Sequence, residues 1–367
     1  MHDTTLLTAE AVELLSQLIA TPRTSRNEEA AANILADFIE EKRIASDGRE
    51  LYSVCREANN IWCIAADYDT ARPTLLLNAH IDTVKPVSAW TRDPFTPTWE
   101  GDRLYGLGAN DDGASLVSLL QVFRVLCTQE RAYNLVYLAS AEEEVSGRNG
   151  LERVIPLLPP ITVAIVGEPT GMQPAIAEKG LMVLDVTATG KAGHAARNEG
   201  INAIYKALPD IEWFCAYRFE KESPLLGPVK MSVTVINAGT QHNVVPDRCT
   251  FTVDVRSNEC YTNEEIYRQV CASVEAEVTA RSFRLGSSHI DPSHPLVQRA
   301  IALGRTPFGS PTLSDQALMP WPSMKMGPGD SARSHTADEY ICRQEIHNAI
   351  EDYLTILDGS KDNKPIV

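Results

Sequence analysis

The sequence predicts an α/β protein with a mostly parallel central sheet flanked by helices, into which a smaller α+β domain is inserted. In residues 1–174, short strands that are apolar throughout alternate with helical segments, which indicates a sheet buried on both faces. In residues 175–284, apolar and polar residues alternate along the strands, which is typical of a sheet with one covered face. Residues 285–367 return to the first pattern and are expected to complete the main domain.

The elements of the main domain follow from hydrophobic periodicity and from capping residues. Thr8 is expected to cap a first helix over 9–20, and a capping box of Ser25 and Glu28 is expected ahead of a second helix over 29–42. Buried strands are expected at 60–66, 74–81, 133–141 and 162–169, and further helices at 112–126, 150–158, 294–304 and 342–357.

The inserted segment predicts three half-buried strands and two helices. The strands are expected at 181–191, 229–239 and 249–257, and the helices at 200–217 and 263–278. Two such sheets could join edge to edge, which would also cover their exposed strand edges. We therefore expect this segment to act as a lid and dimerisation domain.

Composition and charge narrow the classes of partner. The chain has 367 residues and a net charge of −16, so nucleic acid and anionic membranes are poor partners and a multivalent cation is a plausible one. No apolar run approaches the ~20 residues needed to span a bilayer, and the N-terminus lacks the pattern of a signal peptide. The eight cysteines form no CxxC pair, which argues against thiolate zinc sites. A cytoplasmic protein is expected.

Acidic and histidine residues follow the predicted strands of the main domain. They are His80 and Asp82 after one strand, Asp111 and Asp112 before a helix, Glu142, Glu143 and Glu144 after a second strand, Glu168 after a third, and Asp330 with His335 in the last loop. Ligands of open α/β sheets bind at the carboxyl ends of the strands. So many acids in one cleft would repel one another unless a divalent metal compensated them. Nitrogen and oxygen ligands without thiolate suit Zn²⁺, with Co²⁺ or Mn²⁺ as alternatives.

Each of these features alone has an ordinary structural explanation. A histidine at a strand end can be a hydrogen-bonded core residue, an Asp pair before a helix can cap it, and a Glu triplet can be a solvated face. Their recurrence at five separate strand ends and loops favours a shared site instead.

The motifs resemble a known enzyme family. "LLLNAHIDTV", "WTRDPFTPTWEGDRLYGLGANDDGAS", "ASAEEEVSGRNG" and "IVGEPT" stand in the order and spacing found in the metallopeptidase family of acetylornithine deacetylase, succinyl-diaminopimelate desuccinylase, carboxypeptidase G and aminoacylase. The last loop, "GPGDSARSHTADEY", is most similar to the acetylornithine, acetylcitrulline and acetyl-lysine deacetylase branch. The resemblance implies a zinc-dependent hydrolase that cleaves the amide of an N-acetyl or N-succinyl amino acid of the ornithine or citrulline type, with a place in arginine biosynthesis.

The same resemblance implies roles for individual residues. It implies two Zn²⁺ ions, one held by His80 and Glu168, the other by Glu144 and His335, with Asp111 bridging both. Asp82 would accept a hydrogen bond from the second ring nitrogen of His80 and so orient it. Glu143 would act as the general base, and Glu142, where the family commonly has Asp, would play a supporting part.

In the inserted domain, the resemblance implies that His194 reaches the reaction centre of the partner subunit of a homodimer. Asn243 and Arg256 would bind the carboxylate of the substrate, although Arg256 could instead pair with Asp254. Two departures from the family pattern, Leu107 and Gly113, replace residues that are usually basic.

Two other functions stay open at this point. One is a dipeptidase or aminopeptidase of the same family, and the other is a binding protein that has lost catalysis. Retention of every implied ligand and of Glu143 argues against the second.

Overall fold

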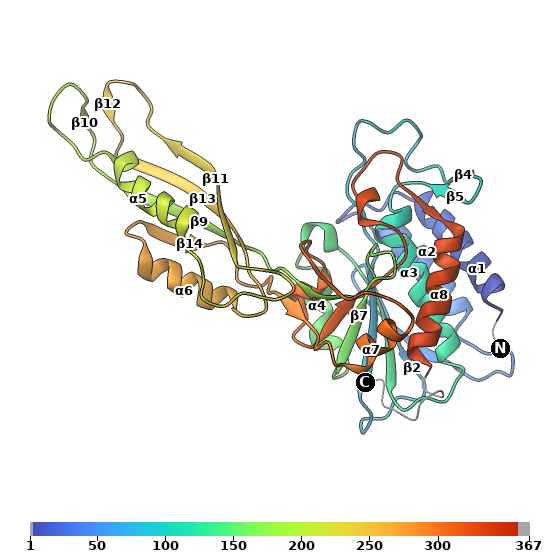
Figure 1. Cartoon of the computed structure of the whole chain (residues 1–367). Coiled ribbons are helices and arrows are strands. Elements are labelled where there is room, and N and C mark those ends of the chain that lie inside the picture. The colour runs from blue at the N-terminus through green and yellow to red at the C-terminus, as the bar shows by residue number, and fades with distance from the viewer. Residues whose placement is uncertain (1–2, 359–367) are drawn as a thin grey trace. The chain divides into compact units, whose positions relative to one another are not determined.

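A computed structural model of the chain describes residues 3–358 and divides them into two compact units (Figure 1). The first unit comprises the described residues up to Ile176, together with Ile290–Phe308 and the described residues from Ser314 onward. The second comprises Ala177–His289 and Gly309–Leu313, whereas the sequence predicts an insert at 175–284. Each unit has its own hydrophobic core. Within residues 3–358, no helix is both long enough and apolar enough to cross a membrane.

The main sheet follows the order β1-β2-β6-β3-β7-β17-β8. Its strands are β1 (Tyr52–Glu57), β2 (Asn60–Ala65), β3 (Thr74–His80), β6 (Asn134–Ser140), β7 (Val163–Val166), β8 (Ala175–Glu178) and β17 (Ser323–Lys325), and the short strands β15 (Ser288–His289) and β16 (Phe308–Ser310) pair with β8. The four central strands, β6 to β17, are parallel, and the margins are antiparallel. The predicted mostly parallel central sheet is therefore confirmed. Because the central strands run the same way, their carboxyl ends share one edge.

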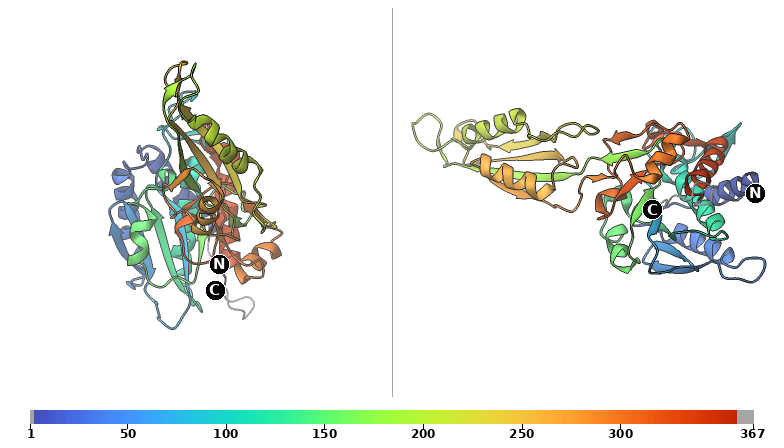
Figure 2. Two further views of the ribbon diagram at one scale, coloured as in Figure 1. Left: turned by 90° about the vertical axis from the view of Figure 1, so that its left-hand side faces the viewer. Right: turned by 60° about the horizontal axis from the view of Figure 1, so that its bottom comes forward.

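Helices bury both faces of this sheet (Figures 1 and 2). One face packs against α1 (Thr4–Ile19), α2 (Glu29–Glu41), α3 (Ala114–Leu126) and α8 (Arg343–Leu357), with α7 (Pro295–Ala302) in the same core. The other face packs against α4 (Leu151–Val154) and neighbouring short turns. A small sheet of β4 (Thr98–Glu100), β5 (Arg103–Tyr105) and β18 (Tyr340–Cys342) is separate from the main one. Burial of both faces explains why the central strands are apolar throughout.

The predicted start of the first helix is wrong, whereas the second helix, α2, begins at Glu29 as the sequence predicts. Helix α1 begins at Thr4, because the carboxylate of Asp3 accepts hydrogen bonds from the backbone N–H groups of Thr5 and Leu6 at 3.0 and 3.3 Å. Thr8 lies inside the helix and donates to the carbonyl of Thr4.

The predicted capping box of α2 does not form either. The hydroxyl of Ser25 donates to Asp82 at 2.7 Å, and the carboxylate of Glu28 accepts from the backbone N–H groups of Arg26 and Glu142. Both side chains therefore serve long-range contacts near the strand ends, which a local capping pattern cannot reveal.

The second unit is an antiparallel sheet with one covered face. The order is β11 (Lys230–Ala238), β13 (Arg248–Arg256), β9 (Met182–Thr189) and β14 (Glu277–Ala280), and helices α5 (Ala203–Ala216) and α6 (Asn263–Ser273) pack on the same face. Alternate residues of β9 and β13 are buried beneath these helices, as the alternating sequence pattern predicts. A two-residue pair, β10 (Gly193–His194) with β12 (Val244–Val245), extends from this unit.

The predicted helix over 263–278 is too long. Val274 adopts an extended conformation, and the carboxylate of Asp210 accepts the backbone N–H groups of Glu275 and Ala276 at 3.1 and 3.0 Å. The chain is thereby turned out of the helix and continues as β14 at the sheet edge.

Candidate metal centre

His80 ends β3 and is 2% exposed. Its Nε2 lies 3.2 Å from Oδ1 of Asp111 and 3.9 Å from Oε2 of Glu143. Its Nδ1 lies 2.9 Å from the backbone carbonyl oxygen of Asp82 and 3.6 Å from that residue's carboxylate. Burial alone would lower the pKa of His80, but interactions with Asp111 and Asp82 outweigh burial and raise it. The imidazole is thus fixed by the chain directly after it and directs Nε2 toward the acids.

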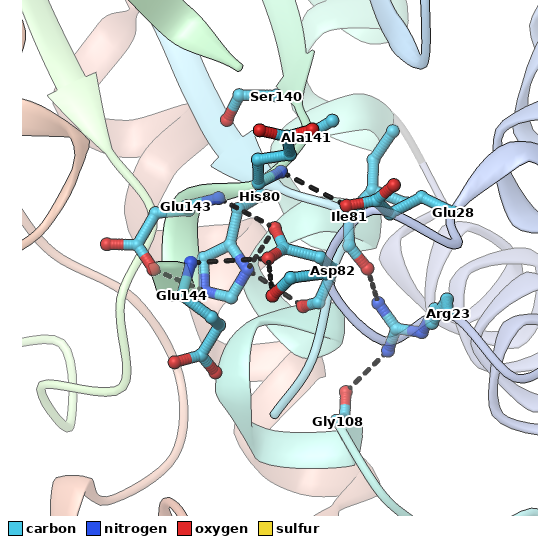
Figure 3. Close-up of polar contacts among 12 residues, drawn as sticks. Arg23, Glu28, His80, Ile81, Asp82, Gly108, Ser140, Ala141, Glu143 and Glu144 are labelled. Atoms are coloured by element: carbon cyan, nitrogen blue, oxygen red, sulfur yellow. Dashed lines mark hydrogen bonds and ion pairs between the residues drawn. The ribbon is translucent and has the colours of Figure 1, made fainter. Parts of the chain in front are cut away.

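The Asp82 carboxylate joins three segments of the chain (Figure 3). It accepts hydrogen bonds from the hydroxyl of Ser25 and from the backbone N–H groups of Glu143 and Glu144, at 2.7, 3.0 and 3.2 Å. Burial tends to raise its pKa, but interactions with His80 and these donors lower it below its usual value. The Asp82 carboxylate therefore positions the glutamate turn, whereas the hydrogen bond of His80 Nδ1, predicted to go to this carboxylate, goes to the backbone carbonyl of Asp82.

Glu143 and Glu144 occupy a short 3₁₀ turn, Glu143–Val145, that follows β6. Glu142, before this turn, has a positive φ of 54° and its carboxylate accepts from the side chain of Asn149 at 3.0 Å. Neighbouring side chains of the triplet thereby point to different partners, and Glu142 stabilises its own loop. Burial and the charge of Glu168 raise the pKa of Glu143 well above its usual value, although His80 opposes the shift.

Asp111 is presented by the loop before α3 and is 8% exposed. Glu339, buried in the last loop, accepts the backbone N–H groups of Gly108, Asn110 and Asp111 at 3.1, 2.8 and 2.9 Å. Burial and the nearby Asp111 raise the pKa of Glu339 to about 8. One carboxylate thus holds the whole loop that carries Asp111.

His335 and Glu168 are the two remaining predicted ligands and come from two other segments. Nε2 of His335 lies 3.0 Å from Oε2 of Glu144 and 3.7 Å from Oδ2 of Asp111, and the hydrogen bond to Glu144 raises its pKa to about 9. Glu168 follows β7, and its pKa is raised well above the usual value by burial and by the charge of Asp111. The side chain of His335 is 55% exposed, so the group opens to solvent on that side.

The donor set fits a divalent cation. Ligand atoms of His80, Asp111 and Glu144 all lie within 4.8 Å of one another, and His335 contacts two of the three residues. These donors are imidazole nitrogens and carboxylate oxygens, the ligands that zinc takes in catalytic sites. A cation would also compensate the clustered negative charge that raises the pKa values of Glu143 and Glu168.

The three remaining predicted residues lie in the second unit. His194 is exposed in β10, where its Nδ1 accepts from the backbone N–H of Ala196 at 3.1 Å. Asn243 is brought beside it, because its carbonyl accepts from the backbone N–H of Ala195 at 3.0 Å. Arg256 is paired with Asp254 through two contacts of 2.8 and 3.2 Å, the alternative that its sequence context left open.

Sequence reasoning missed several residues that shape this centre. Glu339 lies within the recognised loop "SHTADEY", so its proximity to His335 was a usable signal. Asp315, buried, accepts from the hydroxyl of Ser140 at the end of β6, and Arg23 is buried at the strand ends, but neither residue belongs to a motif.

Comparison with known proteins identifies the family. Residues 76–358 match the sequence profile of peptidase family M20/M25/M40. The chain belongs to this family. Family M20 hydrolases similar to it include acetylornithine deacetylase of Proteus mirabilis, 27% identical over 359 residues that cover 90% of this chain and 91% of the relative. Succinyl-diaminopimelate desuccinylase of Delftia acidovorans is 25% identical over 282 residues, 73% of each chain.

Solved structures of the M20 family have the same fold. A dinuclear metal-binding peptidase of Bacillus subtilis superposes with a TM-score of 0.71 at 16% identity and covers 96% of this chain and 98% of its own. An aminopeptidase of Bacillus cereus superposes with a TM-score of 0.72 at 17% identity and covers 95% and 98%. These likenesses confirm the α/β architecture predicted from the sequence.

Proposed function

We propose that the chain is a metal-dependent hydrolase that cleaves the amide bond of an N-acyl amino acid and releases a carboxylate and a free amino acid. The observation that carries the proposal is the convergence of His80, Asp111 and Glu144, with Glu143 beside them. The two relatives named for deacetylation and desuccinylation support an N-acetyl or N-succinyl substrate. An ornithine or citrulline derivative is the proposed substrate, which would place the reaction in arginine biosynthesis.

The residues of the first unit divide into ligands and a proton acceptor. His80 and Glu168 would hold one ion, Glu144 and His335 a second, and Asp111 would bridge them. When bound, two Zn²⁺ ions, or Co²⁺ or Mn²⁺, would supply Lewis acidity toward the amide carbonyl and toward a water molecule. Asp82 and Glu339 keep the ligand segments in register through their backbone hydrogen bonds.

Glu143 is the proposed general base. Its Oε2 lies 3.9 Å from Nε2 of His80, so the carboxylate borders the ligand cluster, while its backbone is fixed by Asp82. It would accept a proton from the attacking water at this oxygen and donate it to the departing amide nitrogen. Accepting a proton from water and donating it to the amine both need a carboxylate that is held in position but does not bind the metal.

The second unit is the proposed lid and dimerisation domain. His194 would complete the reaction centre of the partner subunit, and Asn243 and Arg256 would bind the substrate carboxylate. Because Arg256 is paired with Asp254, a substrate carboxylate would have to compete with Asp254 for the guanidinium.

A substrate panel tests the proposal. Protein stripped by a chelator and reloaded with Zn²⁺ or Co²⁺ is assayed on N-acetyl and N-succinyl derivatives of ornithine, citrulline and lysine, and on dipeptides with a free amino terminus. We expect hydrolysis of an N-acyl amino acid that disappears on stripping and returns on reloading. Hydrolysis of the dipeptides alone would establish the peptidase alternative, and hydrolysis of neither class by metal-loaded protein would overturn the proposal.

A further inference from the structure

Arg23 is a buried cation beside the candidate metal centre. It lies between α1 and α2, and 1% of its surface is exposed. A guanidinium taken out of water needs hydrogen-bond acceptors and compensating charge, because its charged form is otherwise strongly disfavoured. Burial lowers the pKa of Arg23, and the acids Glu339 and Asp82 oppose that shift. These acids thus compensate part of the charge of the buried guanidinium.

The guanidinium bridges two segments that are remote in sequence (Figure 3). Nη1 donates to the backbone carbonyl of Ile81, and Nη2 donates to the carbonyl of Gly108 at 2.9 Å. Ile81 stands between His80 and Asp82, and Gly108 begins the loop that presents Asp111. The Arg23 side chain therefore links the segment that carries His80 to the loop that carries Asp111.

The backbone around Arg23 reinforces this bridge. The N–H of Thr83 donates to the carbonyl of Arg23 at 3.0 Å, and the N–H of Ser25 donates to the carbonyl of Thr83 at 3.2 Å. The loop that carries Arg23 thereby runs alongside the continuation of β3. Its position does not depend on the guanidinium alone, so a substitution of the side chain can be made without releasing the loop.

Two glycines leave the space that the guanidinium fills. A Cβ atom at Gly108 would lie 2.6 Å from Nη2 of Arg23, and one at Gly113 would lie 2.9 Å from the same atom. Gly108 also has a positive φ of 72°, which a side chain would disfavour. At Gly113 such a Cβ atom would also lie 2.4 Å from the carbonyl oxygen of Gly108 and 2.5 Å from Cδ1 of Leu15, so Arg23 is one of three close neighbours of this glycine.

We propose that Arg23 is a positioning residue of the metal centre, which sets the separation between the His80–Asp82 segment and the Asp111 loop through its two-carbonyl bridge. The inference rests on the proposed metal site. Arginine suits this role because its planar fork can reach two acceptors at once, whereas lysine presents a single point of charge. A substitution by lysine keeps the charge and removes the fork.

The test measures metal binding rather than turnover. The dissociation constant for Zn²⁺ is determined by competition with a chromophoric chelator in wild type, Arg23→Lys and Arg23→Met, and the visible absorption of the Co²⁺-loaded proteins reports ligand geometry. We expect both variants to bind metal ~10–100-fold more weakly, as for other groups that orient metal ligands, with an altered Co²⁺ spectrum.

Arg131 provides a matched control. Its side chain is 2% exposed, donates to the carbonyls of Leu126 and Gln129, and pairs with Asp67, all outside the candidate centre. Arg131→Lys and Arg131→Met should lower the thermal midpoint of unfolding but leave the affinity and the Co²⁺ spectrum unchanged.

The outcomes separate the inference from the proposed function. If wild type binds metal and Arg23→Lys has the same affinity and the same spectrum, Arg23 is only a structural residue and the inference is wrong. Should Arg23→Met fail to fold, the lysine variant still decides the question. Failure of the wild-type protein to bind metal would overturn the metal site itself, and the inference with it.

Discussion

Replacement of Glu143 by glutamine separates proton transfer from metal binding. The contact that fixes this residue is made by its backbone N–H, 3.0 Å from Asp82, so the change of side chain leaves the turn in place. The side chain is 11% exposed, and glutamine has nearly the same shape, so we expect little loss of stability. An amide cannot accept the proton of the attacking water, and a positioned general base is typically worth ~10²–10⁴ in rate.

The expected loss in kcat therefore corresponds to about 3–5 kcal/mol of activation free energy. It is measured with the best substrate of the panel, and the metal content of the same preparation is determined by elemental analysis. We expect metal content equal to wild type and a large loss of kcat. Glu142→Gln is the matched control, because the same change one residue earlier affects a carboxylate that binds Asn149 and should leave kcat within a few-fold.

Two results would refute the assignment of Glu143 as general base. Loss of bound metal in Glu143→Gln would mean that the residue is a ligand. Retention of wild-type kcat, with metal content unchanged, would mean that another group accepts the proton.

Four further predictions concern the same centre and the second unit. Asp82→Ala leaves Ser25 and two backbone N–H groups without their acceptor, so metal affinity measured by chelator competition should fall ~10–100-fold; an unchanged affinity would contradict the role given to Asp82. Chelation should abolish hydrolysis and Zn²⁺ or Co²⁺ should restore it, and full activity in metal-free protein would exclude metal catalysis. The side chains of Tyr205 and Ile236 are 71% and 53% exposed, which favours a dimer through the second unit. Light scattering should therefore show a dimer for the wild type and a weaker dimer for Ile236→Lys. A monomeric wild type at micromolar concentration would contradict this prediction. His194→Ala should lower kcat ~10²–10³-fold at unchanged metal content. Mixing the His194→Ala and Glu143→Gln proteins should restore activity in heterodimers. No activity would return if His194 acted within its own chain.

Local patterns were sufficient for much of the architecture. The apolar strands around His80 predicted a sheet buried on both faces, and the structure has one because helices cover each side. Parallel strands end at one edge, so acids and histidines after separate strands could be expected to meet, as His80, Asp111 and Glu144 do. The alternation in 249–257 likewise predicted a sheet with one covered face.

Local patterns failed where a side chain or a segment took a distant partner. Ser25 and Glu28 have the spacing of a capping box, but they bond Asp82 and the backbone of Glu142 instead. The helical periodicity of 263–278 continues beyond Ser273, yet Asp210, far earlier in the chain, takes the backbone N–H groups that would have extended the helix. In both cases a hydrogen bond to a residue distant in the sequence replaced the local hydrogen bond that the pattern predicts.

The sequence by itself therefore determined the order of the elements and the residue types that gather at the strand ends, because these depend on periodicity and on the direction of parallel strands, and its motifs indicated the family. Only the tertiary structure decided how the segments that carry the proposed ligands are held. Glu339 reaches Asp111 across 228 positions, and Arg23 reaches Gly108 across 85. Contacts between residues so far apart in the sequence depend on the order of strands in the sheet and on the packing of the helices over it. Neither of these leaves a periodic signal in the sequence near the residue that makes the contact.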